Sequence, residues 1–178
     1  MKHLSKILAV ILLAVFLPAC SSDNNGTEPE ESSAINATVV SVSPSESTTP
    51  AGAVIPFSSD ASKFEYRYDQ IEGNLHVRHT DAAFLEGGGE ISVRVNVEEN
   101  IITLIEKQRG ATSNDLTLYD LDYVVSNLPL RVYRVVVIEP YLKKDERPLS
   151  FRMDLVASLE GSVSVVRDQA PWAGMAAL

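Results

Sequence analysis

Short segments in which apolar and polar residues alternate recur along most of this chain, at intervals of about ten residues. The clearest case places Ile91, Val93, Val95 and Val97 at every second position. A period of two is typical of β-strands that have one buried face. Outside the N-terminal apolar run, no stretch has the 3.6-residue period of an amphipathic helix. The pattern therefore predicts an all-β fold.

Eight or nine strands are expected, separated by Gly, Pro, Asn and Asp. They cover residues 38–42, 64–68, 75–79, 91–97, 101–105, 116–125, 131–138, 149–156 and 162–166. Such spacing favours an antiparallel, immunoglobulin-like β-sandwich of about eight strands, and a small β-barrel is the alternative. The string Gly87-Gly88-Gly89 is expected to form a flexible hairpin between two of the strands.

The N-terminus has the zones of a bacterial signal peptide. Two lysines precede an apolar run from Ile7 to Leu17, which as a helix would be about 16 Å long, half of a hydrocarbon core. The string Leu17-Pro18-Ala19-Cys20 resembles a lipobox, in which cleavage after Ala19 leaves Cys20 as the first mature residue. The resemblance implies a diacylglycerol and an N-acyl chain on Cys20, which together give a stable anchor. An ordinary secretory cleavage beside an incidental cysteine is the alternative.

Composition and charge divide the chain into three parts. Residues 1–19 form the signal peptide that is removed, 20–34 an acidic disordered tether, and 35–178 a single β-sandwich domain. Ser21 after the cysteine implies the outer membrane, at its periplasmic face or at the cell surface. A net charge of −9 disfavours nucleic acid as a partner. The lone cysteine excludes a disulfide within the chain.

Two acidic residues are the most distinctive internal candidates. Alternation places Asp120 and Asp122 on one strand face, about 7 Å apart, and Tyr119, Leu121 and Tyr123 on the other. Such a pair could help to hold Ca²⁺ or act as a glycosidase-like pair. Calcium requires six to eight oxygen ligands, however, and no dense Asp/Asn/Gly loop is present. A solvated acidic face backed by buried tyrosines is the stronger interpretation.

The two histidines of the expected domain do not predict a metal site or a catalytic site. His76 and His79 are three residues apart on one strand and therefore point to opposite faces. His79 shares its face with Leu75 and Val77, which predicts a histidine at the edge of the core. No Gly-x-Ser-x-Gly string occurs, and no third group pairs convincingly with either histidine. No catalytic residue, metal or soluble cofactor is expected.

The only tryptophan, Trp172, follows the last expected strand. It either plugs one end of the sandwich or provides a platform on which a sugar stacks, and the plug is the stronger interpretation.

Several strings together resemble a family of small uncharacterised lipoproteins from Bacteroidetes-type bacteria. They are Leu75 to His79, Phe84, Glu90 to Val93, Ile101 to Thr103 with Glu106, Leu118 to Tyr123, Ile138 to Tyr141, Val166-Arg167 and Pro171-Trp172. The resemblance covers most of residues 62–174 and implies no activity. Family members often carry cysteines near the glycine turn and before the Tyr-Asp string. This chain has neither, so no thiol role transfers.

The sequence therefore predicts a lipid-anchored outer-membrane lipoprotein whose sandwich binds a protein or a glycan without catalysis. Its expected partners are membrane lipid, through Cys20, and an unidentified envelope protein or glycan. An envelope-structural or assembly subunit without a small ligand is the first alternative. A hydrolase that uses Asp120 and Asp122 is the second, and it depends on those two carboxylates alone.

Overall fold

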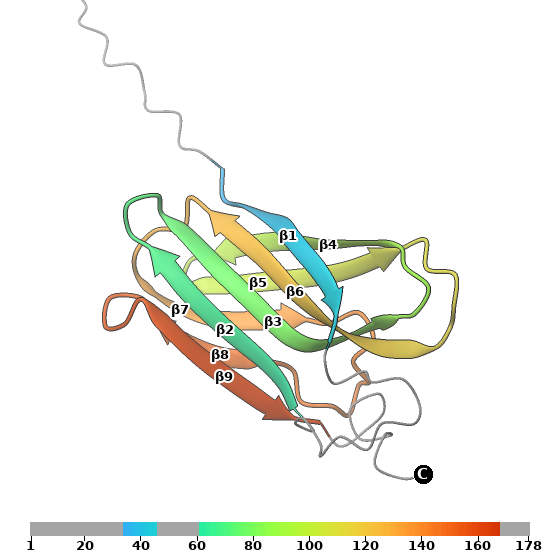
Figure 1. Cartoon of the computed structure of the whole chain (residues 1–178). Helices are drawn as coiled ribbons and strands as arrows, with labels where there is room; N and C mark the ends of the chain where they lie inside the picture. The colour runs from blue at the N-terminus through green and yellow to red at the C-terminus, as the bar shows by residue number, and fades with distance from the viewer. Residues whose placement is uncertain (1–33, 46–60, 168–178) are drawn as a thin grey trace, which may run out of the picture. The chain divides into compact units, whose positions relative to one another are not determined.

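The computed structural model describes residues 34–45 and 61–167, which form nine β-strands (Figure 1). The strands are β1 (Asn36–Pro44), β2 (Ala61–Asp69), β3 (Asn74–Leu85), β4 (Glu90–Glu98), β5 (Ile101–Arg109), β6 (Leu116–Ser126), β7 (Val132–Ile138), β8 (Ser150–Asp154) and β9 (Glu160–Val166). All of them belong to one compact unit, residues 33–178. Within the described residues, no helix has the length and apolarity needed to cross a membrane. The predicted signal peptide, Ala19, Cys20, the tether up to residue 33 and Trp172 lie outside the described residues.

The strands form two sheets, and the predicted β-sandwich is confirmed. A five-stranded sheet has the order β1-β6-β3-β2-β9, a four-stranded sheet has the order β4-β5-β7-β8, and neither is closed into a barrel. Every neighbouring pair is antiparallel except β5 and β7, which run parallel in the middle of the second sheet. The chain passes through β6 of the first sheet between these two strands. The strand order thus differs from the immunoglobulin arrangement, in which both sheets are antiparallel.

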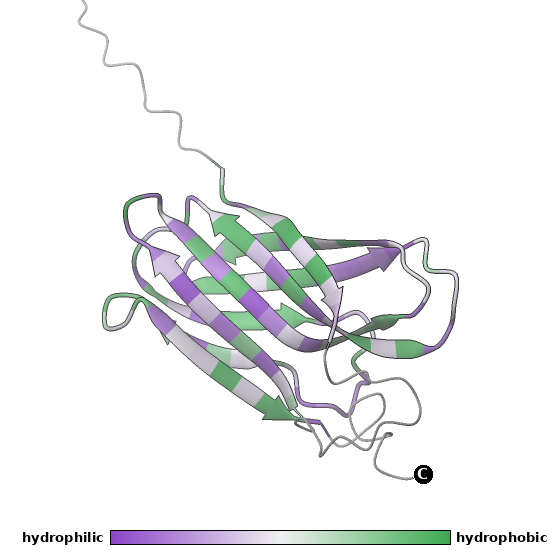
Figure 2. Ribbon diagram, in the orientation of Figure 1, coloured by the Kyte–Doolittle hydropathy of each residue, from purple (hydrophilic) through white to green (hydrophobic). Residues whose placement is uncertain are grey.

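The inward-facing side chains of both sheets form one core. Figure 2 shows the alternation directly, as hydrophobic and hydrophilic bands along each strand. Phe64 of β2 and Phe151 of β8 join the sheets, with ring centroids 5.2 Å apart. The other core residues include Leu75, Val77, Val93, Ile102, Leu104, Leu121, Tyr123, Val125, Tyr133, Val135, Val137 and Met153. Burial of this apolar surface is the main force that holds the two sheets together.

The three consecutive glycines connect the two sheets, and the prediction of a hairpin is wrong. β3 belongs to the five-stranded sheet and β4 to the four-stranded sheet, so the two strands do not pair. All three glycines have positive φ, which gives the chain the sharp turn that it needs there. The Gln108 side chain bonds the backbone N–H and C=O of Leu85 and the C=O of Gly88, and it thereby fixes the connection.

Candidate functional site

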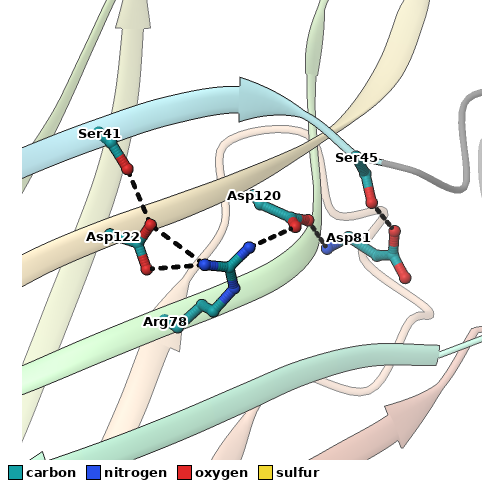
Figure 3. Close-up of polar contacts among 6 residues, drawn as sticks. All are labelled: Ser41, Ser45, Arg78, Asp81, Asp120 and Asp122. Atoms are coloured by element: carbon teal, nitrogen blue, oxygen red, sulfur yellow. Dashed lines mark hydrogen bonds and ion pairs between the residues drawn. The ribbon is translucent and has the colours of Figure 1, made fainter.

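The two aspartates singled out by the sequence are held by one arginine (Figure 3). Arg78 of β3 reaches Asp120 through Nη2, at 3.1 Å, and Asp122 through Nη1, at 3.4 Å. Asp122 also accepts a hydrogen bond of 2.8 Å from Ser41 of β1. These residues are cross-strand neighbours, since Asp122 pairs in register with both Arg78 and Ser41. The aspartates form the acidic side of an ion-pair network that spans three strands.

A bulge in β3 explains why Asp120 is buried. The register between β3 and β6 shifts between His79 and Ala82, and Asp81 adopts a positive φ of 58°. A bulge takes a backbone N–H out of the strand ladder. Asp120 Oδ1 accepts the N–H of Asp81 at 3.2 Å, and Ser45 donates a hydrogen bond to the carboxylate of Asp81. Asp120 is only 8% exposed. The prediction of a solvated acidic face is therefore wrong for this residue.

The network does not leave a free carboxylate pair for catalysis or for a cation. Arg78 contacts both carboxylates, and the pKa of its guanidinium is raised by the hydrogen bond to Asp120 and by the charge of Asp122. In the described part of the chain, no group of three or more His, Cys, Asp or Glu side chains is arranged to hold a metal ion. Chemically, the network is suited to fix the side chains on the outer face of the five-stranded sheet.

Next to this network the outer face has a depression of about 280 Å³. Its polar lining includes the cations Arg67 and Arg78, His76, and the carboxylates Glu65 and Asp122, and its apolar lining includes Val40 and Val124. Arg67 and His76 lie opposite each other on β2 and β3. Cationic and imidazole donors beside aliphatic side chains can bind carboxylates, hydroxyls or peptide carbonyls.

A second polar cluster lies inside the sandwich and is centred on His79. Its Nδ1 lies 2.7 Å from Oε1 of Glu106 on β5, and its Nε2 lies 2.7 Å from Oγ of Ser62 on β2. All three side chains are at most 1% exposed. His79 is therefore fully buried and does not lie at the edge of the core as predicted. The expectation that no third group pairs convincingly with either histidine is wrong for His79.

Two further charged residues extend the cluster to the end of the four-stranded sheet. Glu139, which follows β7, places Oε1 3.9 Å from His79 Nε2, and its Oε2 accepts a bond of 2.5 Å from Arg167. Arg167 also donates to the backbone carbonyl of Arg147. Tyr123 contributes a buried hydroxyl that has no hydrogen-bond partner among residues 34–45 and 61–167. Two carboxylates, one guanidinium and one imidazole are thus buried together, and a protonated His79 makes their formal charges cancel.

The electrostatics of the cluster favour that protonated state. Burial lowers the pKa of His79, but the charge and hydrogen bond of Glu106, with the charge of Glu139, outweigh burial and raise the pKa. Burial also raises the pKa of Glu139, against the opposing effects of His79 and Arg167. Burial and the two glutamates raise the pKa of the Tyr123 hydroxyl well above its ordinary value.

The order serine, histidine, glutamate is that of a nucleophile, a base and an orienting acid. A nucleophile must reach its substrate, whereas Ser62 is 0% exposed. The geometry therefore fits a buried structural network better than a catalytic triad. Sequence reasoning missed Ser62 and Glu106, although both occupy inward positions in alternating strands. A charged residue at an inward position is a signal that a buried partner exists.

The structure brings Asp120 and Asp122 together and places His76 and His79 on opposite faces of β3, as predicted. The roles predicted for Cys20 and Trp172 fall on residues outside the described part. No protein-family model, curated protein or solved structure matches this chain, and the family resemblance therefore stays an expectation from sequence strings.

Proposed function

We propose that this chain is a lipid-anchored outer-membrane lipoprotein whose β-sandwich binds an envelope protein or glycan without catalysing a reaction. The proposed localisation rests on the lipobox-like string that ends in Cys20. The observation that carries the binding role is the depression on the outer face of the five-stranded sheet. Charged donors and an exposed aliphatic side chain converge there on a concave surface.

The depression combines one unpaired cation with a rigid neighbour. Within the described residues, no carboxylate lies within ion-pairing distance of Arg67, whereas Arg78 is fixed by two aspartates. Val40, 66% exposed, adds an apolar contact at one side. A ligand with a carboxylate or several hydroxyls beside an apolar group fits this lining. A side chain that is already fixed loses little entropy on binding, which favours recognition.

Catalysis is the weaker interpretation for both polar clusters. The two carboxylates on which a hydrolase would depend are engaged by Arg78, and the Ser62–His79–Glu106 set is enclosed by the core. An envelope-structural role remains the alternative. It would require a stable copurifying partner whose binding does not change when residues of the depression are substituted.

The proposed localisation is tested by cell fractionation and by protease treatment of intact cells. Cys20→Ala should move the protein from the membrane fraction to the soluble fraction, because acylation supplies the anchor. Protease added outside distinguishes the cell surface from the periplasm. A Cys20→Ala protein that stays in the outer membrane would overturn the proposed anchor.

The binding role is tested with an array of envelope glycans and with immobilised outer-membrane proteins. The double variant Arg67→Ala, His76→Ala should bind about tenfold more weakly, because it removes two donors from the depression. Lys144→Ala, which removes an exposed cation from the loop before β8, is the matched control. Trp172→Ala tests the predicted sugar platform separately. Binding that is equal in the wild type and the double variant would contradict the proposed site.

A further inference from the structure

The outer face of the four-stranded sheet has an aliphatic centre. Ile101 and Ile105 of β5 point outward, and so do Val136 and Ile138 of β7. The register joins them into one patch, because Ile105 lies beside Ile138 and Thr103 lies beside Val136. Ile101 is 46% exposed and Ile138 47%. Outer faces of sandwich sheets are normally polar, and β-branched aliphatic side chains on both central strands are therefore a departure from the usual pattern.

Four cations lie around this patch, together with two acids, Glu90 and Glu98, on the outward side of β4. Arg94 of β4 pairs in register with Ile105, and Arg134 of β7 pairs with Ile101. Lys107 and Arg109 continue the outward side of β5. In the described part of the structure, no carboxylate lies within 4.0 Å of any of these four cations. We call the four aliphatic residues and these four cations the basic-aliphatic face.

The five-stranded sheet has the opposite arrangement. There Lys63 pairs with Glu65 at 2.8 Å, and Arg78 pairs with two aspartates. The outer face of the four-stranded sheet also has one ion pair, Arg152 with Asp154 at 2.8 Å, and two exposed acids, Glu90 and Glu98. Its cations nevertheless outnumber its acids, and four of them form no ion pair within the described residues. The contrast is stronger because the whole chain carries a net charge of −9. A set of unpaired cations on an acidic protein is a local feature that requires its own explanation.

We propose that the basic-aliphatic face docks an acidic protein, in a contact with an aliphatic centre and a rim of ion pairs. Protein interfaces combine an apolar centre, which supplies most of the binding energy, with a charged rim that sets orientation and association rate. Arginine is enriched in such interfaces. The complementary partner presents a flat apolar area surrounded by aspartate or glutamate. This surface and the depression lie on different sheets, so the proposed docking face and the proposed ligand-binding depression can be tested independently of each other.

A second copy of this chain does not supply that partner. A two-fold dimer through this face would bring together two surfaces that each carry more cations than acids, so charge repulsion opposes it. The outer face of the five-stranded sheet does not complement it either, since Glu65, Asp120 and Asp122 are already engaged by Lys63 and Arg78. The observations therefore favour a different protein over self-association.

A lipid surface fits less well than a protein. Peripheral membrane surfaces insert aromatic or long aliphatic side chains below the headgroups. The outward positions of β4, β5, β7 and β8 carry no aromatic residue. Ile101 and Ile138 are about half exposed and Ile105 is less exposed, which suits contact with another protein surface better than insertion into lipid.

The test is a photo-crosslinking experiment on the full chain in its native envelope. A photoreactive amino acid replaces Thr103, which lies between Ile101 and Ile105 and points outward. We expect a crosslink to one protein, on a peptide that contains aspartate or glutamate. The double variant Arg94→Glu, Arg134→Glu should lower the yield about tenfold, because both rim charges become repulsive. Lys63→Glu, Lys144→Glu, at two positions outside this face and outside the depression, makes the same change in net charge and should leave the yield unaltered.

A charge-swap variant makes the result decisive. Lysine in place of the partner's crosslinked carboxylates should restore the yield with the Arg94→Glu, Arg134→Glu chain and lower it with the wild type. A crosslink to phospholipid, to a second copy of this chain or to no molecule would overturn the proposal. So would a crosslink that persists after charge reversal. Circular dichroism of each purified variant verifies that a lost crosslink does not reflect loss of the fold.

Discussion

The buried contact between His79 and Glu106 provides a quantitative prediction about stability. Glu106→Gln keeps the size of the side chain and one acceptor oxygen, but it removes the negative charge 2.7 Å from His79 Nδ1. Removal of one partner of a buried ion pair costs about 3–5 kcal/mol. We expect the lower end, about 3 kcal/mol, because the amide oxygen can still accept the imidazole N–H. At about 3 °C per kcal/mol for a domain of this size, Tm should fall by about 10 °C.

The pH dependence gives a second readout of the same contact. The pKa of His79 is raised in the folded state, chiefly because Glu106 outweighs the effect of burial. The stabilisation is therefore complete below the ordinary histidine pKa, about 6.5, and is lost as pH rises through the folded-state pKa. The raised pKa of Glu139 also makes stability fall as pH rises, and this effect begins at a lower pH, near the ordinary pKa of glutamate. Wild-type stability should fall between pH 6 and an alkaline value such as 8.5, and Glu106→Gln should flatten the part of this slope that belongs to His79.

Urea unfolding at several pH values measures both effects, and the NMR titration of the His79 ring reports its protonation directly. Glu90→Gln is the matched control, because Glu90 is an exposed acid at an outward position of β4. It should change stability by less than about 0.5 kcal/mol. A loss below about 1 kcal/mol in Glu106→Gln would refute the reasoning. Wild-type stability that rises over the same pH interval would refute it independently.

Two further substitutions test other features of the core and of the crossover. Tyr123→Phe should leave stability unchanged or raise it by up to about 1 kcal/mol, because the buried hydroxyl has no hydrogen-bond partner in the part of the chain that the structure describes. A loss of more than about 1 kcal/mol in urea unfolding would contradict this expectation. Gly89→Ala should cost clearly more than Gly88→Ala. Both glycines have positive φ, so alanine at either position costs about 1–3 kcal/mol of backbone strain. At Gly89 the new Cβ would also lie 2.6 Å from the Arg109 carbonyl oxygen, whereas at Gly88 it meets nothing within 4 Å. Equal costs would contradict this difference.

The positions of the strands were predictable, because each strand carries its own signal. In β4 the inward residues Ile91 to Val97 alternate with polar residues, and the structure buries that side. The pairing of the strands was not predictable, because it depends on contacts between residues far apart in the sequence. Nothing local in Ile101–Arg109 indicates that its neighbour is β7 and not β6. For the same reason, the glycine string was assigned to a hairpin although it connects two sheets.

The candidate site was predictable only in part. The sequence identified Asp120 and Asp122 by their shared strand face, but their common partner Arg78 became visible only when β3 and β6 were paired. The burial of Asp120 depends on the bulge at Asp81. One extra residue in β3 makes this bulge, and no local sequence pattern around Asp81 predicts it. Glu106 could have been found, since an acid at an inward strand position requires a buried partner.

The pairing of β2 with β9 has a consequence for how the chain folds as it is made. β2 begins at Ala61, and its outer neighbour β9 ends at Val166, so the five-stranded sheet stays incomplete until about a hundred more residues have been synthesised. The parallel pair β5–β7 adds the same constraint to the other sheet. Topologies dominated by such distant pairings fold slowly and expose unpaired strand edges meanwhile. Until β9 is available, the edge of β2 that faces away from β3 therefore lacks its strand partner.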